Sequence, residues 1–129
     1  MKSIIEKTIL NAITATNTPV AVDVKYAKKI TLNYTEGGTV NNRSGSLAIT
    51  VSCDGGSTYV AFNMLIDNVA NANTENLTRV ASKVRAAAGT DILFMDLKYF
   101  GITHLKATCT ITDGAAPTGN FTLKALIES

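Results

Sequence analysis

Apolar and polar residues alternate along most of the chain. The stretch SLAITVSC, residues 46–53, places its large apolar side chains on one face of an extended segment, and STYVAFNM, residues 57–64, repeats the pattern. A period of two is typical of a half-buried β-strand. Asp54-Gly55-Gly56 lies between them, and glycine tolerates the positive φ of a tight turn, so we predict one β-hairpin. The side chains expected to face inward are Leu47, Ile49, Val51, Cys53, Val60, Phe62 and Met64.

The C-terminal third shows the same alternation. ITHLKATCTIT, residues 102–112, and FTLKALI, residues 121–127, are joined by DGAAPTGN, a connection rich in turn-forming residues. We predict a second hairpin here, with a longer and exposed loop. Its expected inward side chains are Leu105, Ala107, Cys109, Ile111, Phe121, Leu123, Ala125 and Ile127.

Further strands are predicted from the same pattern at 8–14, 28–35, 77–86 and 91–97. In the 77–86 strand, Arg79, Lys83 and Arg85 share one parity, which indicates a solvated face. The region 64–77 has no clear period, and we expect a long crossover of the Greek-key kind there. In the 28–35 strand the expected inward side chains are Ile30, Leu32 and Tyr34. In the 91–97 strand they are Leu93, Met95 and Leu97, or those of the opposite parity.

Seven to eight short strands bounded by Gly, Asn and Asp predict an all-β fold. We expect an antiparallel β-sandwich of jelly-roll or immunoglobulin-like type. The 129 residues suit a single domain spanning 1–129, with 1–10 as a candidate loose N-terminal arm. No βαβ pattern competes with this prediction.

Composition narrows the possible partners. The chain is 46% hydrophobic and 17% charged, and its net charge of +2 is scattered along the sequence. Such a balance favours a globular protein and gives no basic stripe for nucleic acid. Glu6 and Lys7 interrupt the first apolar run before it reaches the length of a signal peptide. We therefore expect no nucleic-acid or membrane partner.

The first hairpin turn matches the outline of an Asp-box, Ser-x-Asp-x-Gly-x-Thr-aromatic. Ser52, Asp54, Gly56, Thr58 and Tyr59 occupy the defined positions. In this motif the Asp and Thr bond to backbone groups of the turn itself, so it builds a hairpin and supplies no catalysis. A sialidase propeller would need several four-stranded blades, for which the chain is too short.

No convincing catalytic, cofactor or metal constellation is present, and we expect a protein that is not an enzyme. His104, the single histidine, has no nucleophile or orienting carboxylate near it in sequence. Cys53 and Cys109 match no zinc or redox spacing. Both fall on apolar parity, which favours small buried thiols, and a disulfide stays open if their strands are neighbours.

The stretch from Pro19 to the end is similar in strand and turn order to small β-sandwich virion proteins of tailed bacteriophages. The segments that carry the resemblance are KKITLNYT, the Asp-Gly-Gly hairpin, the region after it and KATCTIT. In that group it most resembles capsid decoration or head auxiliary proteins. The resemblance implies a protein made in the bacterial cytoplasm and assembled into the virion. It would bind the major capsid protein, or neck and tail proteins, as a homo-oligomer or in many copies.

For such a protein the loops 37–45, 68–76 and 113–120 are the expected contact surfaces. The candidate contact residues are Gly37, Asn41, Asn42, Arg43, Asn71, Asn73, Asp113, Thr118 and Asn120.

Two alternatives remain open at the level of sequence. A neck or tail adaptor, or a fibre-base component, fits the same pattern. A carbohydrate-binding β-sandwich would stack sugars on exposed aromatics, for which Tyr59, Tyr99 and Phe100 are the candidates.

Overall fold

The computed structural model describes residues 3–67, 77–97 and 101–129. This part of the chain is all β-strand and turn, which confirms the predicted class. It therefore contains no helix long and apolar enough to cross a membrane. The strands are β1 (Ile4–Ile13), β2 (Val22–Asp23), β3 (Lys29–Ser52), β4 (Val60–Phe62), β5 (Met64–Asp67), β6 (Leu77–Val80), β7 (Lys83–Arg85), β8 (Gly89–Met95) and β9 (His104–Glu128).

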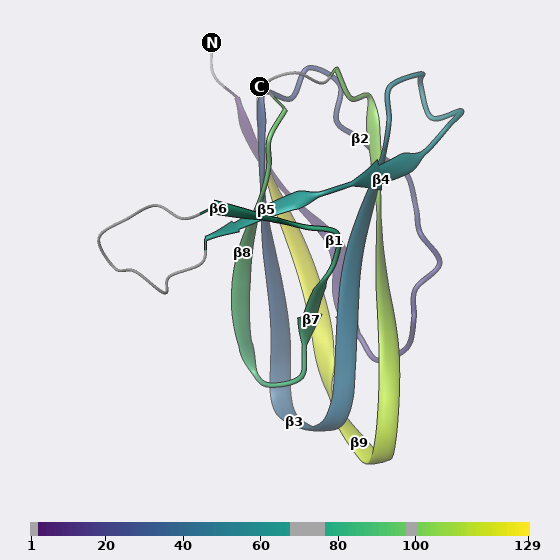
Figure 1. The fold of residues 1–129 in the computed structure, drawn as a ribbon, viewed down its shortest axis with the longest axis vertical. Helices are drawn as coiled ribbons and strands as arrows, with labels where there is room; N and C mark the ends of the chain where they lie inside the picture. Colours follow the sequence, from purple (N-terminus) through teal and green to yellow (C-terminus); the bar gives the residue numbers. More distant parts are fainter. Residues whose placement is uncertain (1–2, 68–76, 98–100) are drawn as a thin grey trace.

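Two long strands, β3 and β9, dominate the fold. They pair antiparallel along their whole length, from Lys29 opposite Glu128 to Ser52 opposite His104. Both strands run down the long axis, turn, and return (Figure 1). The two-stranded ribbon is therefore folded over on itself, and its two halves face each other.

The remaining strands widen each half of the ribbon into a layer. In one layer, β1 pairs with the second half of β9, and β8 pairs with the first half of β3 and leads on to β5 and β6. In the other layer, β2 pairs with the first half of β9, while β4 and β7 pair with the second half of β3. All of these pairings are antiparallel and belong to one curled sheet. This curling produces the predicted β-sandwich.

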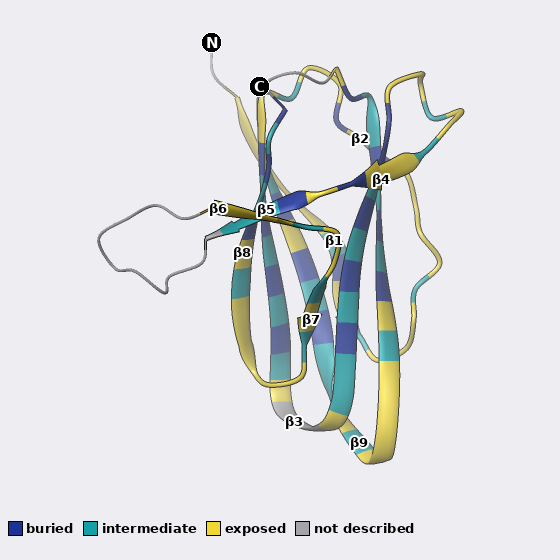
Figure 2. Cartoon of the chain, viewed as in Figure 1, coloured by how far each residue is buried: buried dark blue, intermediate teal, exposed yellow. Residues whose placement is uncertain are grey.

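The core lies between the two halves of the ribbon, where buried positions alternate with intermediate ones (Figure 2). Tyr34 connects the layers, because its hydroxyl donates to the Gly45 carbonyl at 2.7 Å and lies 3.3 Å from Cys109 Sγ. Its ring stacks on Phe121 at 6.0 Å between centroids. Fully buried aliphatic side chains complete the core: Ile30, Leu32, Leu47, Met64, Leu93, Leu105 and Leu123.

The predicted second hairpin is wrong, although its buried face is right. Segments 102–112 and 121–127 lie in opposite layers and do not pair with each other. Each segment has other strand partners: Leu123 lies between Leu10 and Tyr34, and Leu105 lies between Val22 and Val51. Segments 28–35 and 46–53 likewise lie in opposite layers, since they belong to the two halves of β3 and each pairs with a different half of β9.

The first hairpin is confirmed, since β3 and β4 pair from Ile49 opposite Phe62 to Val51 opposite Val60. Two of its inward positions are wrong. Cys53 is exposed and Val60 is 57% exposed, whereas Ser52 is buried. The alternation of buried and intermediate positions stops at Ser52 because β3 ends there. The Ser52 hydroxyl oxygen accepts a hydrogen bond from the turn. Cys109 is buried as predicted, and both thiols are free.

The expected crossover at 64–77 is also corrected. Its two ends form the antiparallel pair β5 and β6, with Met64 opposite Val80 and Asp67 opposite Leu77. They are therefore neighbouring strands that continue the sheet beyond β8. Residues 68–76 lie outside the described residues.

The candidate loose arm at 1–10 is ordered from Ile4 onward. Most β1 side chains are exposed, so the apolar pattern gives little sign of it. Its backbone nevertheless pairs with the edge of β9, from Ile4 opposite Glu128 to Ile13 opposite Phe121. Backbone pairing rather than burial makes this segment a strand.

The expected solvated face at 79–85 is only partly correct. Arg79 is mostly exposed, but the Arg85 side chain is 15% exposed and bonds to Asp91, while Val84 is 55% exposed. Residues 81–82, between β6 and β7, are not in a strand. The alternation of inward and outward side chains therefore does not continue from β6 into β7.

Candidate functional site

The fold brings two of the three predicted contact loops together. Residues 37–45 and 113–120 form the turn of the folded ribbon, at one end of the long axis (Figure 1). Gly37 lies opposite Asn120, Asn41 opposite Thr118 and Arg43 opposite Asp113, with register shifts on both sides of Asn41. We call this region, 37–45 with 113–120, the ribbon bend. Asn71 and Asn73, in the third loop, lie outside the described residues.

Arg43 fixes the conformation of the ribbon bend. Its Nε and Nη2 donate to the two carboxylate oxygens of Asp113 at 2.7 and 3.3 Å, and Nη1 donates to the Gly119 carbonyl at 2.7 Å. A two-point guanidinium–carboxylate pair fixes orientation as well as distance. The contact lowers the pKa of Asp113 and raises the pKa of Arg43. One side chain therefore joins both strands of the bend.

Further contacts reinforce this shape. Asn42 Nδ2 donates to the Ala115 carbonyl at 2.6 Å. The backbone takes positive φ at Gly38, Asn42, Ala116 and Gly119, a conformation that glycine and asparagine adopt most readily. Gly37 leaves room for the Asn120 side chain, since a Cβ atom would lie 2.9 Å from Asn120 Oδ1. The bend is thus held by side-chain bonds as well as by strand pairing.

The ribbon bend carries an open hollow of about 460 Å³. Its lining side chains are polar except at Gly114 and at Ala86, which comes from the segment between β7 and β8. The other lining residues are Asn42, Arg43, Ser44, Thr112, Asp113 and Gly114. A shallow polar hollow with a fixed ion pair suits contact with another protein surface better than enclosure of a small molecule.

The Asp-box stretch lies at the opposite end of the molecule and forms the self-bonded turn that the sequence predicts. Asp54 Oδ1 accepts from the Ser57 and Thr58 amides at 3.1 and 2.9 Å, and from the Ser52 hydroxyl at 2.6 Å. The Gly56 amide donates to Ser52 Oγ at 2.9 Å. These bonds, first that from Ser52, lower the pKa of Asp54 to about 2.

The neighbouring aromatic and histidine side chains are engaged with local partners. Lys106 Nζ lies 4.1 Å from the centre of the Tyr59 ring, so a cation occupies a face that a sugar would use. His104 Nδ1 lies 3.0 Å from the Thr103 hydroxyl. Tyr99 and Phe100 lie outside the described residues. Among the described residues, no group of three or more His, Cys, Asp and Glu side chains could hold a metal ion.

No protein-family model matches the chain. No curated protein matches it either. The fold is similar to the crystal structure of the SPBc2 prophage-derived protein YomS, with a TM-score of 0.66 over 100% of this chain and 96% of that chain. The two sequences are 15% identical, so the likeness shows the fold.

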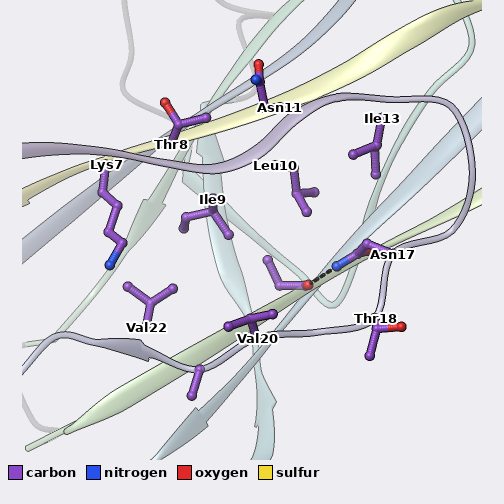
Figure 3. A pocket seen from close by; sticks show the side chains of 12 residues that line it. Lys7, Thr8, Ile9, Leu10, Asn11, Ile13, Asn17, Thr18, Val20 and Val22 are labelled. Atoms are coloured by element: carbon purple, nitrogen blue, oxygen red, sulfur yellow. Dashed lines mark hydrogen bonds between the residues drawn. The ribbon is translucent and has the colours of Figure 1, made fainter.

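A second cleft, which the sequence did not indicate, opens between β1 and residues 17–22 (Figure 3). It has a volume of about 400 Å³, and Leu10, Val22 and Ala107 are its buried lining residues. The cleft lies beside the edge of β9 that β2 covers only at its start.

Side chains protect this edge of β9 in place of a full strand. Asn17 Nδ2 donates to the Ala107 carbonyl at 2.9 Å, and the Cys109 amide donates to Asn17 Oδ1 at 2.7 Å. The Ile111 amide donates to Thr16 Oγ1 at 2.9 Å. Exposed strand edges otherwise invite pairing with other chains. Thr16 and Asn17 therefore bond to backbone groups that would otherwise be free to pair with another strand.

Proposed function

We propose that this chain is a non-enzymatic structural protein of a bacteriophage virion, and specifically a capsid decoration or head auxiliary protein. In this role it binds the shell of the major capsid protein and stabilises it. The observation that carries the proposal is the similarity in fold to a prophage-derived protein, which extends over 100% of this chain.

The ribbon bend is the surface we propose for the contact with the shell. Bonds from Arg43 and Asn42 already fix its backbone, so little conformational entropy is lost on binding. Residues 114–116 at its tip are exposed and can reach a partner. Many equivalent sites on a symmetric particle multiply the effect of a modest single contact, and so would a homo-oligomer. Assembly would take place in the bacterial cytoplasm.

Copy number in purified virions tests this role. Quantitative mass spectrometry would measure the ratio of this chain to the major capsid protein. We expect a ratio near one copy per capsid subunit or per capsomer. About a dozen copies per particle would instead assign the chain to the neck, tail or fibre base, and absence from the particle would contradict a virion role.

The contact surface has its own test, in which the two ends of the molecule are compared. Ala115→Arg places a large charge at the exposed tip of the ribbon bend, and Ser57→Arg places one at the exposed turn at the opposite end. We expect Ala115→Arg to reduce binding to empty capsids in a sedimentation assay at least tenfold, with Ser57→Arg unchanged. Equal binding by both variants would exclude the bend, while loss with both would point to a more extended surface.

A further inference from the structure

Glu36 is a buried carboxylate without a hydrogen-bond partner. It follows Tyr34 on the inner face of β3, and its backbone lies between Gly89 of β8 and Phe121 of β9. The residue is 1% exposed, and neither of its carboxylate oxygens is hydrogen-bonded. Buried charged groups are normally paired, because removing a charge from water without a compensating partner is strongly unfavourable.

A short segment covers this carboxylate. β7 pairs with the second half of β3 and β8 with the first half, so residues 83–89 cross from one layer to the other (Figure 1). We call residues 83–89 the strap. Arg85 fastens it, since Nη1 donates to Asp91 at 2.7 Å and Nη2 donates to the Ala87 carbonyl at 3.0 Å. Arg85 Nε is buried and has no partner.

Gly89 makes room for this arrangement. A Cβ atom there would lie 2.5 Å from Arg85 Nη2, and its φ of 144° disfavours other residues. The guanidinium therefore sits directly against the backbone where the strap enters β8. Ala86 in the strap also lines the hollow of the ribbon bend, so any opening of the strap removes one wall of that hollow.

The charged and titratable groups around Glu36 come from four strands: Arg85 of β7, Asp91 of β8, Tyr34 of β3 and Cys109 of β9. Burial raises the pKa of Glu36, and the Arg85 charge and the Ala87 backbone oppose the shift. Burial raises the pKa of Tyr34 and of Cys109, and a charge on Glu36 raises both further. The single positive charge of Arg85 lies near two carboxylates, Glu36 and Asp91. Its carboxylate hydrogen bond is made to Asp91.

We propose that Glu36 is a buried proton-binding site that controls the strap. With a proton taken from solvent, the neutral carboxyl stays buried and the strap stays closed. When the carboxyl releases that proton to solvent, only the Arg85 charge and the Ala87 backbone offset the buried charge, and the strap opens to admit water. Low pH therefore favours the closed strap, and rising pH favours the open one. The inference rests on this geometry alone and is independent of the proposed function.

Hydrogen exchange across pH tests the switch in the full chain. Protection factors, which correct for the pH dependence of intrinsic exchange, would be measured for the strap amides from pH 4 to pH 8. Above the ordinary value of 4.5 for a Glu carboxyl, we expect protection to fall by up to tenfold per pH unit until the raised pKa is passed. In Glu36→Gln, which cannot ionise, we expect a flat profile.

The matched control is Glu6→Gln, on the exposed face of β1. We expect its strap profile to equal that of the wild type. A carbon-13 titration of the Glu36 carboxyl in the wild type gives an answer that needs no variant to fold. Titration at or below 4.5, or a strap profile shared by wild type and Glu36→Gln, would overturn the proposal.

Discussion

At the scale of single residues, the closeness of the two layers is decided by a few contacts. Gly45 is the clearest case, because a Cβ atom there would lie 2.6 Å from Phe121 Cε1 and 2.7 Å from the Tyr34 hydroxyl. Its carbonyl also accepts the Tyr34 hydrogen bond. The sequence offered Gly45 only as part of a flexible loop. Its importance follows from Tyr34 and Phe121, which lie in the facing layer and are more than ten residues away in sequence.

Gly45→Ala is therefore expected to destabilise the protein by about 1 to 3 kcal/mol, the usual cost of overpacking a core. Urea denaturation followed by circular dichroism would measure the free energy of unfolding. Gly101→Ala is the matched control, since a Cβ atom at Gly101 meets nothing within 4 Å. Equal stability of the two variants would mean that the layers are not in contact at Gly45.

Asp54 makes a prediction about pH at the same scale. Its folded pKa of about 2 lies below its ordinary value of 3.8, so the charged form is favoured in the folded state. The stability that it contributes is present above pH 3.8 and is lost as pH falls towards 2. We expect Asp54→Asn to show a shallower loss of thermal stability between pH 4 and pH 2 than the wild type. An identical acid profile would contradict this account of the turn.

At the scale of elements, the alternation of residues correctly identified most buried faces but not the strand partners. Leu105, Ala107 and Cys109 face inward as predicted, yet their neighbours are β2 and β3 and not the segment 121–127. The short connection between 112 and 121 suggested a hairpin because hairpins are the common outcome of such loops. Here β3 bends beside β9, and its two halves pair with the two halves of β9.

The edge of β9 leads to a prediction for Asn17. Asn17→Ala removes the partners of the Ala107 carbonyl and the Cys109 amide. Unsatisfied backbone groups at a partly buried edge cost about 1 to 3 kcal/mol, and we expect a loss of that size in thermal or urea unfolding. Amide exchange at Cys109 should also accelerate. Asn11→Ala, at an exposed position lining the same cleft, is the control and should leave both measurements unchanged.

At the scale of the whole molecule, folding of the ribbon brings 37–45 and 113–120 to one end and the Asp-box turn to the other (Figure 1). Their Gly and Asn content predicted loops between separate strands, but each segment is a bend within one long strand, β3 or β9. Their shared site was not predictable, because Arg43 and Asp113 are 70 residues apart and meet only through strand pairing.

The two cysteines report on closure of the sandwich. Cys53 is exposed and Cys109 is buried against Tyr34. We expect a thiol reagent to label one cysteine per chain in the native protein and both in denaturant. Cys53→Ser should remove native labelling. Rapid labelling of Cys109 in that variant would contradict a closed core.

The sequence by itself determined which side chains face inward along most strands and where the Asp-box turn forms. Both follow from local properties: the two-residue period of a strand, and side chains that bond to the backbone a few positions away. The tertiary structure decided which strands pair, how the ribbon folds and which loops share a site. Pairing uses backbone groups that are the same in every residue but proline, so the choice of partner depends on how the whole chain packs.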